Sequence, residues 1–124
     1  MKLLLDTHVL IWWSGGKPIA AAAAEAIRSP DNEVAISAAS VWEAEIKAAS
    51  GKLLLTADLD SEPAEHGFQS LDISAAHATA AARLPQHHGD PFDRMLVAQA
   101  QLEGFTLVTR DPVFERYAVA VLRA

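Results

Sequence analysis

Short apolar runs alternate along the chain with longer stretches in which apolar residues recur every three or four positions. The run Leu3–Leu5 predicts a strand buried on both faces, as in a parallel sheet, and similar runs predict strands over 33–36, 68–73, 105–109 and 119–122. The longer stretches predict helices over 7–13, 19–29, 38–50, about 58–66, 74–83 and 91–103, and a helical turn over 113–117. Strands that alternate with helices in this way indicate an α/β protein with a parallel sheet.

The stretch 90–111, DPFDRMLVAQAQLEGFTLVTRD, has the strongest local signals. Asp90 is a good N-cap, and Pro91 suits the first helical position, where its missing N–H costs nothing. Gly104 can end this helix in the left-handed conformation. One carboxylate, Asp93, therefore falls in the first turn of a helix, and another, Asp111, follows the end of a strand.

Other acids are predicted to reach the same place. Asp6 ends the run Leu3–Leu5, so it lies at the carboxyl end of its strand as Asp111 does, and ligands of open α/β sheets bind at these ends. Asp93 can join them from the start of its helix. A fourth acid is either Glu43 or Glu45 on the helix over 38–50, and spacing alone does not decide between them.

A cluster of carboxylates predicts a metal site. Neighbouring carboxylates repel each other and raise one another's pKa, and a hard divalent cation removes that conflict. The sequence has no cysteine and no His-Glu-x-x-His motif, so the donor set favours Mg²⁺ or Mn²⁺ over zinc. Each acid also has an ordinary structural interpretation, for example Asp90 as a cap, Asp111 as the start of a turn before Pro112 and Glu45 as a solvated helix residue.

Composition narrows the class of protein. At 124 residues the chain is expected to form one domain over 1–124, and its many alanines favour helices. The net charge of −6 argues against a general nucleic-acid coat, unless the acids are concentrated in a cation-binding site. No apolar stretch approaches the ~20 residues that span a membrane, and Asp6 interrupts the start too early for a signal peptide. We therefore expect a cytoplasmic protein without a membrane segment.

Several motifs together resemble a known family. LLLDTH over 3–8, SVWE over 40–43 with Lys47, GKL over 51–53 and the stretch 88–111 are similar to the PIN-domain ribonucleases, and more narrowly to the VapC toxins of bacterial toxin–antitoxin pairs. The similarity covers nearly the whole chain in the family's order. It implies a three-layer α/β/α sandwich with a central parallel sheet and Mg²⁺- or Mn²⁺-dependent endoribonuclease activity. It also implies a homodimer and inhibition by a cognate VapB-type antitoxin.

The same resemblance assigns the site. By position it makes Asp6, Glu43, Asp93 and Asp111 the metal-binding catalytic acids, and it prefers Glu43 over Glu45. Asp90 remains a cap. The implied reaction is hydrolysis of RNA, tRNA or rRNA, by metal-activated water, which leaves 5′-phosphate and 3′-hydroxyl ends.

Two other functions are weighed against this one. The first is a PIN module that acts mainly by binding RNA or a partner, with little cleavage. The second is a metal-dependent phosphohydrolase of small phosphoesters, which is disfavoured because His8 stands where such enzymes carry a second aspartate and because no glycine-rich phosphate loop is present.

Several further residues have expectations attached. Lys47 is expected to pair with Glu43, since the two are four residues apart on one helix. Arg94 and Arg110 are expected either to contact phosphate or to form salt bridges within the acid cluster. The adjacent His87 and His88 are expected to be exposed in a loop.

Overall fold

The protein is built on a five-stranded parallel sheet with the strand order β3-β2-β1-β4-β5. This computed structural model describes all residues, 1–124. In the central strand β1, Leu4 is paired with Ala35 on one side and Leu107 on the other. The strands are β1 (Lys2–Leu5), β2 (Glu33–Ser37), β3 (Gln69–Leu71), β4 (Thr106–Thr109) and β5 (Val121–Arg123).

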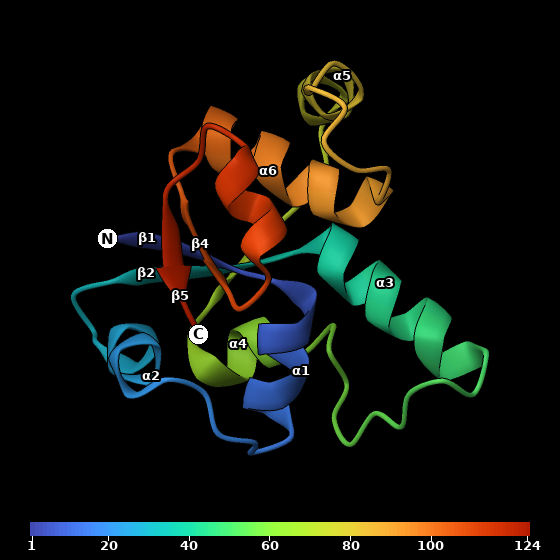
Figure 1. Ribbon diagram of the computed structural model, residues 1–124. Helices are drawn as coiled ribbons and strands as arrows, with labels where there is room; N and C mark the ends of the chain where they lie inside the picture. Colours follow the sequence, from blue (N-terminus) through green and yellow to red (C-terminus); the bar gives the residue numbers. More distant parts are fainter.

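Helices cover both faces of this sheet (Figure 1). The fold is therefore the predicted three-layer α/β/α sandwich, with α1, α2 and α4 on one face and α5, α6 and η1 on the other. Helix α3 projects from the carboxyl end of the sheet, where it contacts both α1 and α6. The helices are α1 (Thr7–Ser14), α2 (Ala21–Arg28), α3 (Ala38–Ala49), α4 (Glu62–His66), α5 (Ala75–Ala82), α6 (Pro91–Glu103) and the 3₁₀ helix η1 (Pro112–Arg116).

The apolar run of β1 supplies both halves of the core. Successive side chains of a strand point to opposite faces, so Leu3 and Leu5 pack on the side of α1 and α2, while Leu4 packs on the side of α6. All three leucines are fully buried. An apolar run without alternation is therefore what this central position requires.

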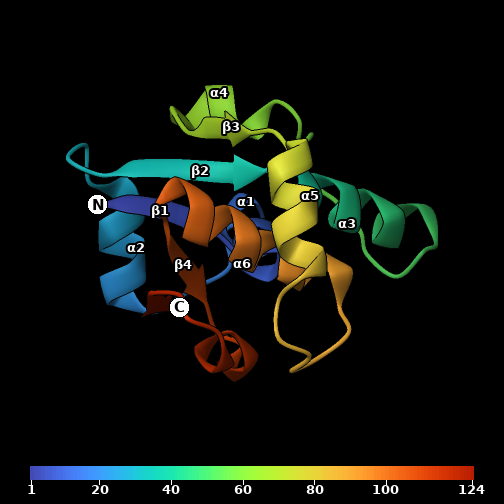
Figure 2. The same ribbon diagram turned by 90° about the horizontal axis from the view of Figure 1, so that it is seen from above.

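The order in which the strands are added to the sheet reverses at β1, so that β1 and β4 are neighbours in the sheet although they are far apart in the sequence. From β1 the chain continues to β2 and β3 on one side, whereas β4 and β5 lie on the other side of β1 (Figure 2). The loops after β1 and β4 therefore separate at the carboxyl edge, which is where open α/β sheets bind their ligands. Asp6 and Asp111 follow these two strands.

Two predicted elements differ from the structure. The helix predicted over about 58–66 is confined to Glu62–His66, because residues 56–61 form turns in which Ser61 bonds to the carbonyl of Asp58 and Leu59 is buried as an anchor. The final strand begins at Val121 rather than at 119, because the N–H of Val119 bonds to the Tyr117 carbonyl in a turn. No helix has the length and apolar character needed to cross a membrane.

Candidate metal centre

Asp6 lies directly after β1 and is 3% exposed. Its backbone N–H donates to the Val108 carbonyl at 3.0 Å, which fixes it against β4. The Thr109 hydroxyl donates to Oδ2 of the Asp6 side chain at 2.7 Å. A buried carboxylate at the end of an apolar strand is therefore held in one orientation by its neighbouring strand.

Glu43 reaches the same edge from α3. Ser37 begins this helix, since its hydroxyl accepts a hydrogen bond from the N–H of Ala39 at 3.0 Å. Lys47 donates to Glu43 Oε2 at 2.9 Å, which confirms the predicted pair. The other oxygen, Oε1, is buried and has no hydrogen-bond partner.

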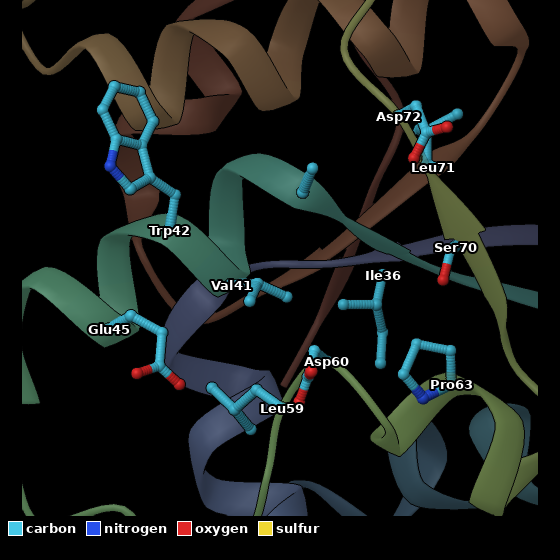
Figure 3. A pocket seen from close by; sticks show the side chains of 11 residues that line it. Ile36, Val41, Trp42, Glu45, Leu59, Asp60, Pro63, Ser70, Leu71 and Asp72 are labelled. Carbon is cyan, nitrogen blue, oxygen red and sulfur yellow. The ribbon is translucent and has the colours of Figure 1, made fainter.

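Glu45 points elsewhere. It is exposed and lines a hollow of about 370 Å³ on the other side of α3, which none of the four candidate acids enters (Figure 3). Spacing left Glu43 and Glu45 as alternatives, and the fold separates them because they lie two positions apart on one helix and face different directions. The solvated state expected of Glu45 is confirmed.

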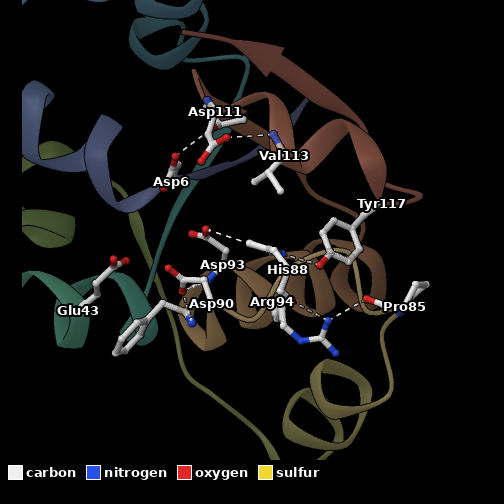
Figure 4. A network of polar contacts seen from close by, with 12 residues as sticks. Asp6, Glu43, Pro85, His88, Asp90, Asp93, Arg94, Asp111, Val113 and Tyr117 are labelled. Carbon is white, nitrogen blue, oxygen red and sulfur yellow. Dashed lines mark hydrogen bonds and ion pairs between the residues drawn. The ribbon is translucent and has the colours of Figure 1, made fainter.

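Asp93 lies in the first turn of α6, and Asp90 caps that helix. One oxygen of Asp90 accepts hydrogen bonds from the N–H groups of Phe92 and Asp93, at 2.9 and 3.1 Å. The interpretation of Asp90 as a cap is therefore confirmed. The helix directs the Asp93 carboxylate toward the region that Asp6 also faces (Figure 4). Glu43 lies across this region, on α3.

Asp111 has two structural roles at the end of β4. Its Oδ1 accepts a hydrogen bond from the N–H of Val113 at 3.0 Å and so begins η1, as expected for a turn before Pro112. Its own N–H donates to the Thr109 hydroxyl at 3.0 Å. Thr109 therefore links Asp111 to Asp6, although Asp111 itself is exposed.

The carboxylates affect one another's ionisation. Burial raises the pKa of Asp93 to about 8, with further increases from the neighbouring charges of Asp90, Asp6, Glu43 and Asp111. Burial also raises the pKa of Asp6, and Glu43 adds to that increase, while the Thr109 hydrogen bond and His8 oppose it. The other three acids proposed from the sequence, Asp6, Glu43 and Asp111, are therefore near enough to Asp93 to act on its charge.

The type of donor atom at this site, carboxylate oxygen, suits a hard divalent cation. The carboxylates are oxygen ligands, and the unpartnered Oε1 of Glu43 is a buried acceptor that a hydrated cation would satisfy. The hydroxyl of Thr7, next to Asp6, is likewise buried without a partner, so it does not cap α1. As placed, no three histidine or acidic side chains are close enough together to hold a metal ion.

The arginines expected near phosphate or acids have other partners. Arg94 is buried, and its guanidinium donates to the backbone carbonyls of Ala81, Leu84 and Pro85 at 2.8–3.0 Å. Arg110 lies over the ring of Trp12 at 4.3 Å and donates to the Ala124 carbonyl. The expected salt bridges with the acid cluster are therefore wrong, because spacing shows a neighbouring charge but not a backbone carbonyl from another element. Phosphate contact stays a prediction for Arg110, which is exposed.

His88 was missed by the sequence reasoning. It is only 21% exposed at the side chain, and its Nε2 lies 3.3 Å from Oδ2 of Asp93. Its Nδ1 lies 2.7 Å from the hydroxyl of Tyr117 (Figure 4). The expectation of an exposed histidine pair therefore holds for His87 but is wrong for His88.

Comparison with known proteins identifies similar chains. The family model described as PIN domain matches residues 3–120. Ribonuclease VapC22 of Mycobacterium tuberculosis is 36% identical over 114 residues, which cover 88% of this chain and 86% of that protein.

Solved structures with the same fold include toxin–antitoxin complexes. VapBC2 from Rickettsia felis, bound to a DNA fragment from its promoter, superposes with a TM-score of 0.78 at 19% identity, covering 100% of this chain and 99% of that one. A toxin–antitoxin complex from Klebsiella pneumoniae has a TM-score of 0.68 at 25% identity, with 97% of this chain and 95% of that chain covered.

Proposed function

This chain belongs to the PIN domain family, in its VapC branch, and from this premise we propose that it is a metal-dependent endoribonuclease, the toxin of a toxin–antitoxin pair. The observation that carries the proposal is the approach of four acids, from four separate segments, to one carboxyl edge of the sheet. The unit that we assign to this activity is a single PIN domain over 1–124.

The cation we propose is Mg²⁺ or Mn²⁺. Asp6, Glu43 and Asp93 would hold it in part through its retained waters, since as placed they are too far apart to bind one ion together. Asp111 would be at the margin, since its Oδ1 already accepts the N–H of Val113. When bound, such a cation lowers the pKa of water and neutralises charge on a phosphodiester. Its arrival would also relieve the repulsion that raises the pKa of Asp93.

The chain's own residues prepare this centre. Thr109 fixes the orientation of the Asp6 carboxylate, and Lys47 fixes that of Glu43. With Oε2 engaged by Lys47, Oε1 of Glu43 is the oxygen that can accept a proton from water and orient that water toward phosphorus. Fixed carboxylates lower the barrier because little reorganisation is left for the reaction itself.

The substrate we propose is RNA, with tRNA or rRNA as the candidates. Single-stranded loops are the accessible targets in folded RNA, because their bases and backbone can be splayed open. The proposed reaction leaves 5′-phosphate and 3′-hydroxyl ends. Mapping of RNA 5′ ends after brief induction of the protein would identify the cleaved RNA and check the chemistry of its ends.

The matched pair Glu43 and Glu45 tests the catalytic assignment. Both acids lie on α3, but only Glu43 turns toward the other acids. We expect Glu43→Gln to slow RNA cleavage in Mg²⁺ at least ~100-fold, as loss of a general base does, and Glu45→Gln to leave the rate unchanged. The measurement is the single-turnover cleavage rate of total RNA, with EDTA abolishing it and added Mn²⁺ restoring it.

Two results would reject Asp6 and Glu43 as catalytic acids. Full cleavage by a folded Asp6→Asn or Glu43→Gln protein would show that these acids do not form the catalytic centre. Equal losses in Glu43→Gln and Glu45→Gln would mean that the charge of α3, and not one placed carboxylate, is what matters.

A binding module with little cleavage is the second candidate. It is favoured by the distances among the acids, of which no three are placed closely enough to hold a metal ion. This function predicts that the wild-type protein retains RNA in a gel-shift experiment with Mn²⁺ while the RNA stays intact. Cleavage that depends on Glu43 would exclude it.

The partners we propose are a VapB-type antitoxin and a second copy of this chain. An antitoxin is supported by the complexes in which the Rickettsia and Klebsiella relatives were solved. An antitoxin with a basic tail would suit the acidic side chains of the centre, of which Asp111 is exposed. An inhibitory complex with the product of the neighbouring reading frame would test this partner.

A further inference from the structure

A chain of hydrogen bonds runs from the core to one acid of the proposed centre. Tyr117 is 4% exposed, and its hydroxyl lies 2.7 Å from Nδ1 of His88. Nε2 of His88 lies 3.3 Å from Oδ2 of Asp93 (Figure 4). We propose that His88, held by Tyr117, is a positioning residue that orients the Asp93 carboxylate for cation binding. This inference rests on the function proposed above.

The donor and acceptor roles follow from the chemistry of the three groups. With a cation bound, Asp93 is an ionised carboxylate, which only accepts hydrogen bonds, so Nε2 of His88 must then donate to it. A neutral imidazole that donates through Nε2 must accept through Nδ1, and therefore the Tyr117 hydroxyl donates to it. The buried tyrosine thus fixes one tautomer and one ring orientation of His88.

The loop that carries His88 is also held by contacts other than the hydrogen bonds between Tyr117, His88 and Asp93. Arg94 lies one residue after Asp93, and its guanidinium donates to the carbonyls of Ala81, Leu84 and Pro85. Its Nη1 also approaches the His88 carbonyl, at 3.5 Å. The backbone of the loop and the imidazole ring are therefore both fixed relative to the start of α6.

His88 gives Asp93 the same kind of support that the buried acids of the centre receive. Thr109 holds Asp6 and Lys47 holds Glu43, each through one side-chain oxygen. His88 does the same for Asp93, whose only side-chain hydrogen bond comes from this imidazole. Hydrogen bonds to ligating carboxylates set their orientation, and their loss costs about 10- to 100-fold in metal affinity or activity.

The neighbouring His87 provides a matched control. Its ring packs edge-on against the same Tyr117 ring at 4.9 Å between centroids, but it makes no hydrogen bond to an acid. Loss of His87 therefore removes packing on Tyr117 but keeps the hydrogen bonds from Tyr117 through His88 to Asp93. Loss of His88 removes these hydrogen bonds and leaves the packing of His87.

The experiment compares His88→Ala, His88→Gln, Tyr117→Phe and His87→Ala in the full chain. Mn²⁺ affinity is measured by electron paramagnetic resonance, and cleavage of an RNA substrate gives kcat and KM. We expect His88→Ala to weaken Mn²⁺ binding about tenfold and to lower kcat similarly, with KM for RNA unchanged. His87→Ala should stay within about twofold of the wild type in each.

Two variants separate positioning from general structure. The amide of Gln can place a donor where Nε2 stood, so His88→Gln should recover most of the Mn²⁺ affinity. Tyr117→Phe keeps the ring but removes the hydroxyl, so the ¹⁵N shifts of His88 should change from those of a single tautomer to an average of two. Mn²⁺ affinity should fall in this variant by less than in His88→Ala.

Several results would overturn the inference. They are wild-type Mn²⁺ affinity in His88→Ala, equal losses in His87→Ala and His88→Ala, or no recovery in a folded His88→Gln protein. Failure of the proposed function gives a different result. A wild-type protein that binds Mn²⁺ but cleaves no RNA would reject the endoribonuclease function, and the Mn²⁺ affinities of the His88 variants would still test the role of His88.

Discussion

At the scale of the residue, the acids of the centre are held in an unfavourable arrangement. Burial and four neighbouring carboxylates together raise the pKa of Asp93 to about 8, and the one hydrogen bond from His88 does not outweigh them. Asp6, at 3% exposure, also has a raised pKa. Asp93 therefore resists ionisation at neutral pH, and Asp6 resists it more than an exposed aspartate does.

The contribution of Asp93 to the free energy of unfolding should consequently fall as pH rises. Below about pH 4 Asp93 is protonated in both states, and between there and pH 8 only the unfolded chain releases the proton. Raising the pH through this window therefore favours unfolding. We expect Asp93→Asn, in EDTA, to raise the free energy of unfolding at pH 8 by on the order of 2 kcal/mol and to change it little at pH 4.

Urea denaturation at the two pH values measures this effect, and Glu45→Gln is the control because that acid is exposed and outside the centre. Mg²⁺ at pH 8 should stabilise the wild type and have less effect on Asp93→Asn. A difference in the free energy of unfolding between Asp93→Asn and the wild type that is the same at pH 4 and pH 8 would contradict the raised pKa.

At the scale of the element, α6 depends on its cap. Asp90 accepts the N–H groups of Phe92 and Asp93, and Pro91 begins the helix. We expect Asp90→Ala to cost about 1 kcal/mol in the free energy of unfolding, while Asp90→Ser retains most of it because serine also caps helices. Thermal or urea denaturation measures both. Equal losses for alanine and serine would mean that the charge near Asp93, rather than the cap, is what counts.

Elements with local signals were predictable from the sequence. The start of α6 at Pro91, its end at Gly104 and the buried strand β1 depend on residues within a few positions, so spacing and capping rules found them. The helix predicted over 58–66 failed because Leu59 is buried in a turn, and burial there comes from the rest of the fold.

The residues of the candidate site also fall into two groups, those that local sequence signals predicted and those that they did not. The end of an apolar run placed Asp6, and the cap before Asp93 placed that acid at a helix start. Arg94 and His88 could not be placed, since their partners are loop carbonyls and the hydroxyl of Tyr117. These contacts form only when α6, the preceding loop and η1 come together, and no spacing rule describes them.

At the scale of the whole molecule, one surface is unusually apolar. Trp42 and Ile46 of α3 are 60% and 44% exposed, and Ile73 is 38% exposed. Trp42 packs edge-on against Phe92 at 5.1 Å, and both line a hollow of about 160 Å³ with Ile73. Contiguous exposed apolar surface of this kind marks sites of association.

The proposed homodimer would use this surface. We expect the wild-type protein to have the mass of a dimer in light scattering after size exclusion, and Trp42→Glu to have that of a monomer, because a charge there would be buried against apolar groups. Leu54→Glu is the control, since Leu54 is 87% exposed but outside this surface. A monomeric wild type would reject the homodimer, and a dimeric Trp42→Glu would reject this surface.

The position of β1 in the middle of the sheet has a consequence for synthesis. Asp6 is synthesised 103 residues before its partner Thr109, and strand β4 is likewise made long after β1. A nascent chain therefore carries its first acid without the strand that fixes it, and without Asp93 until α6 is translated. A fragment that ends before α6 should therefore lack the proposed nuclease activity, which would begin only after α6 and β4 have been made.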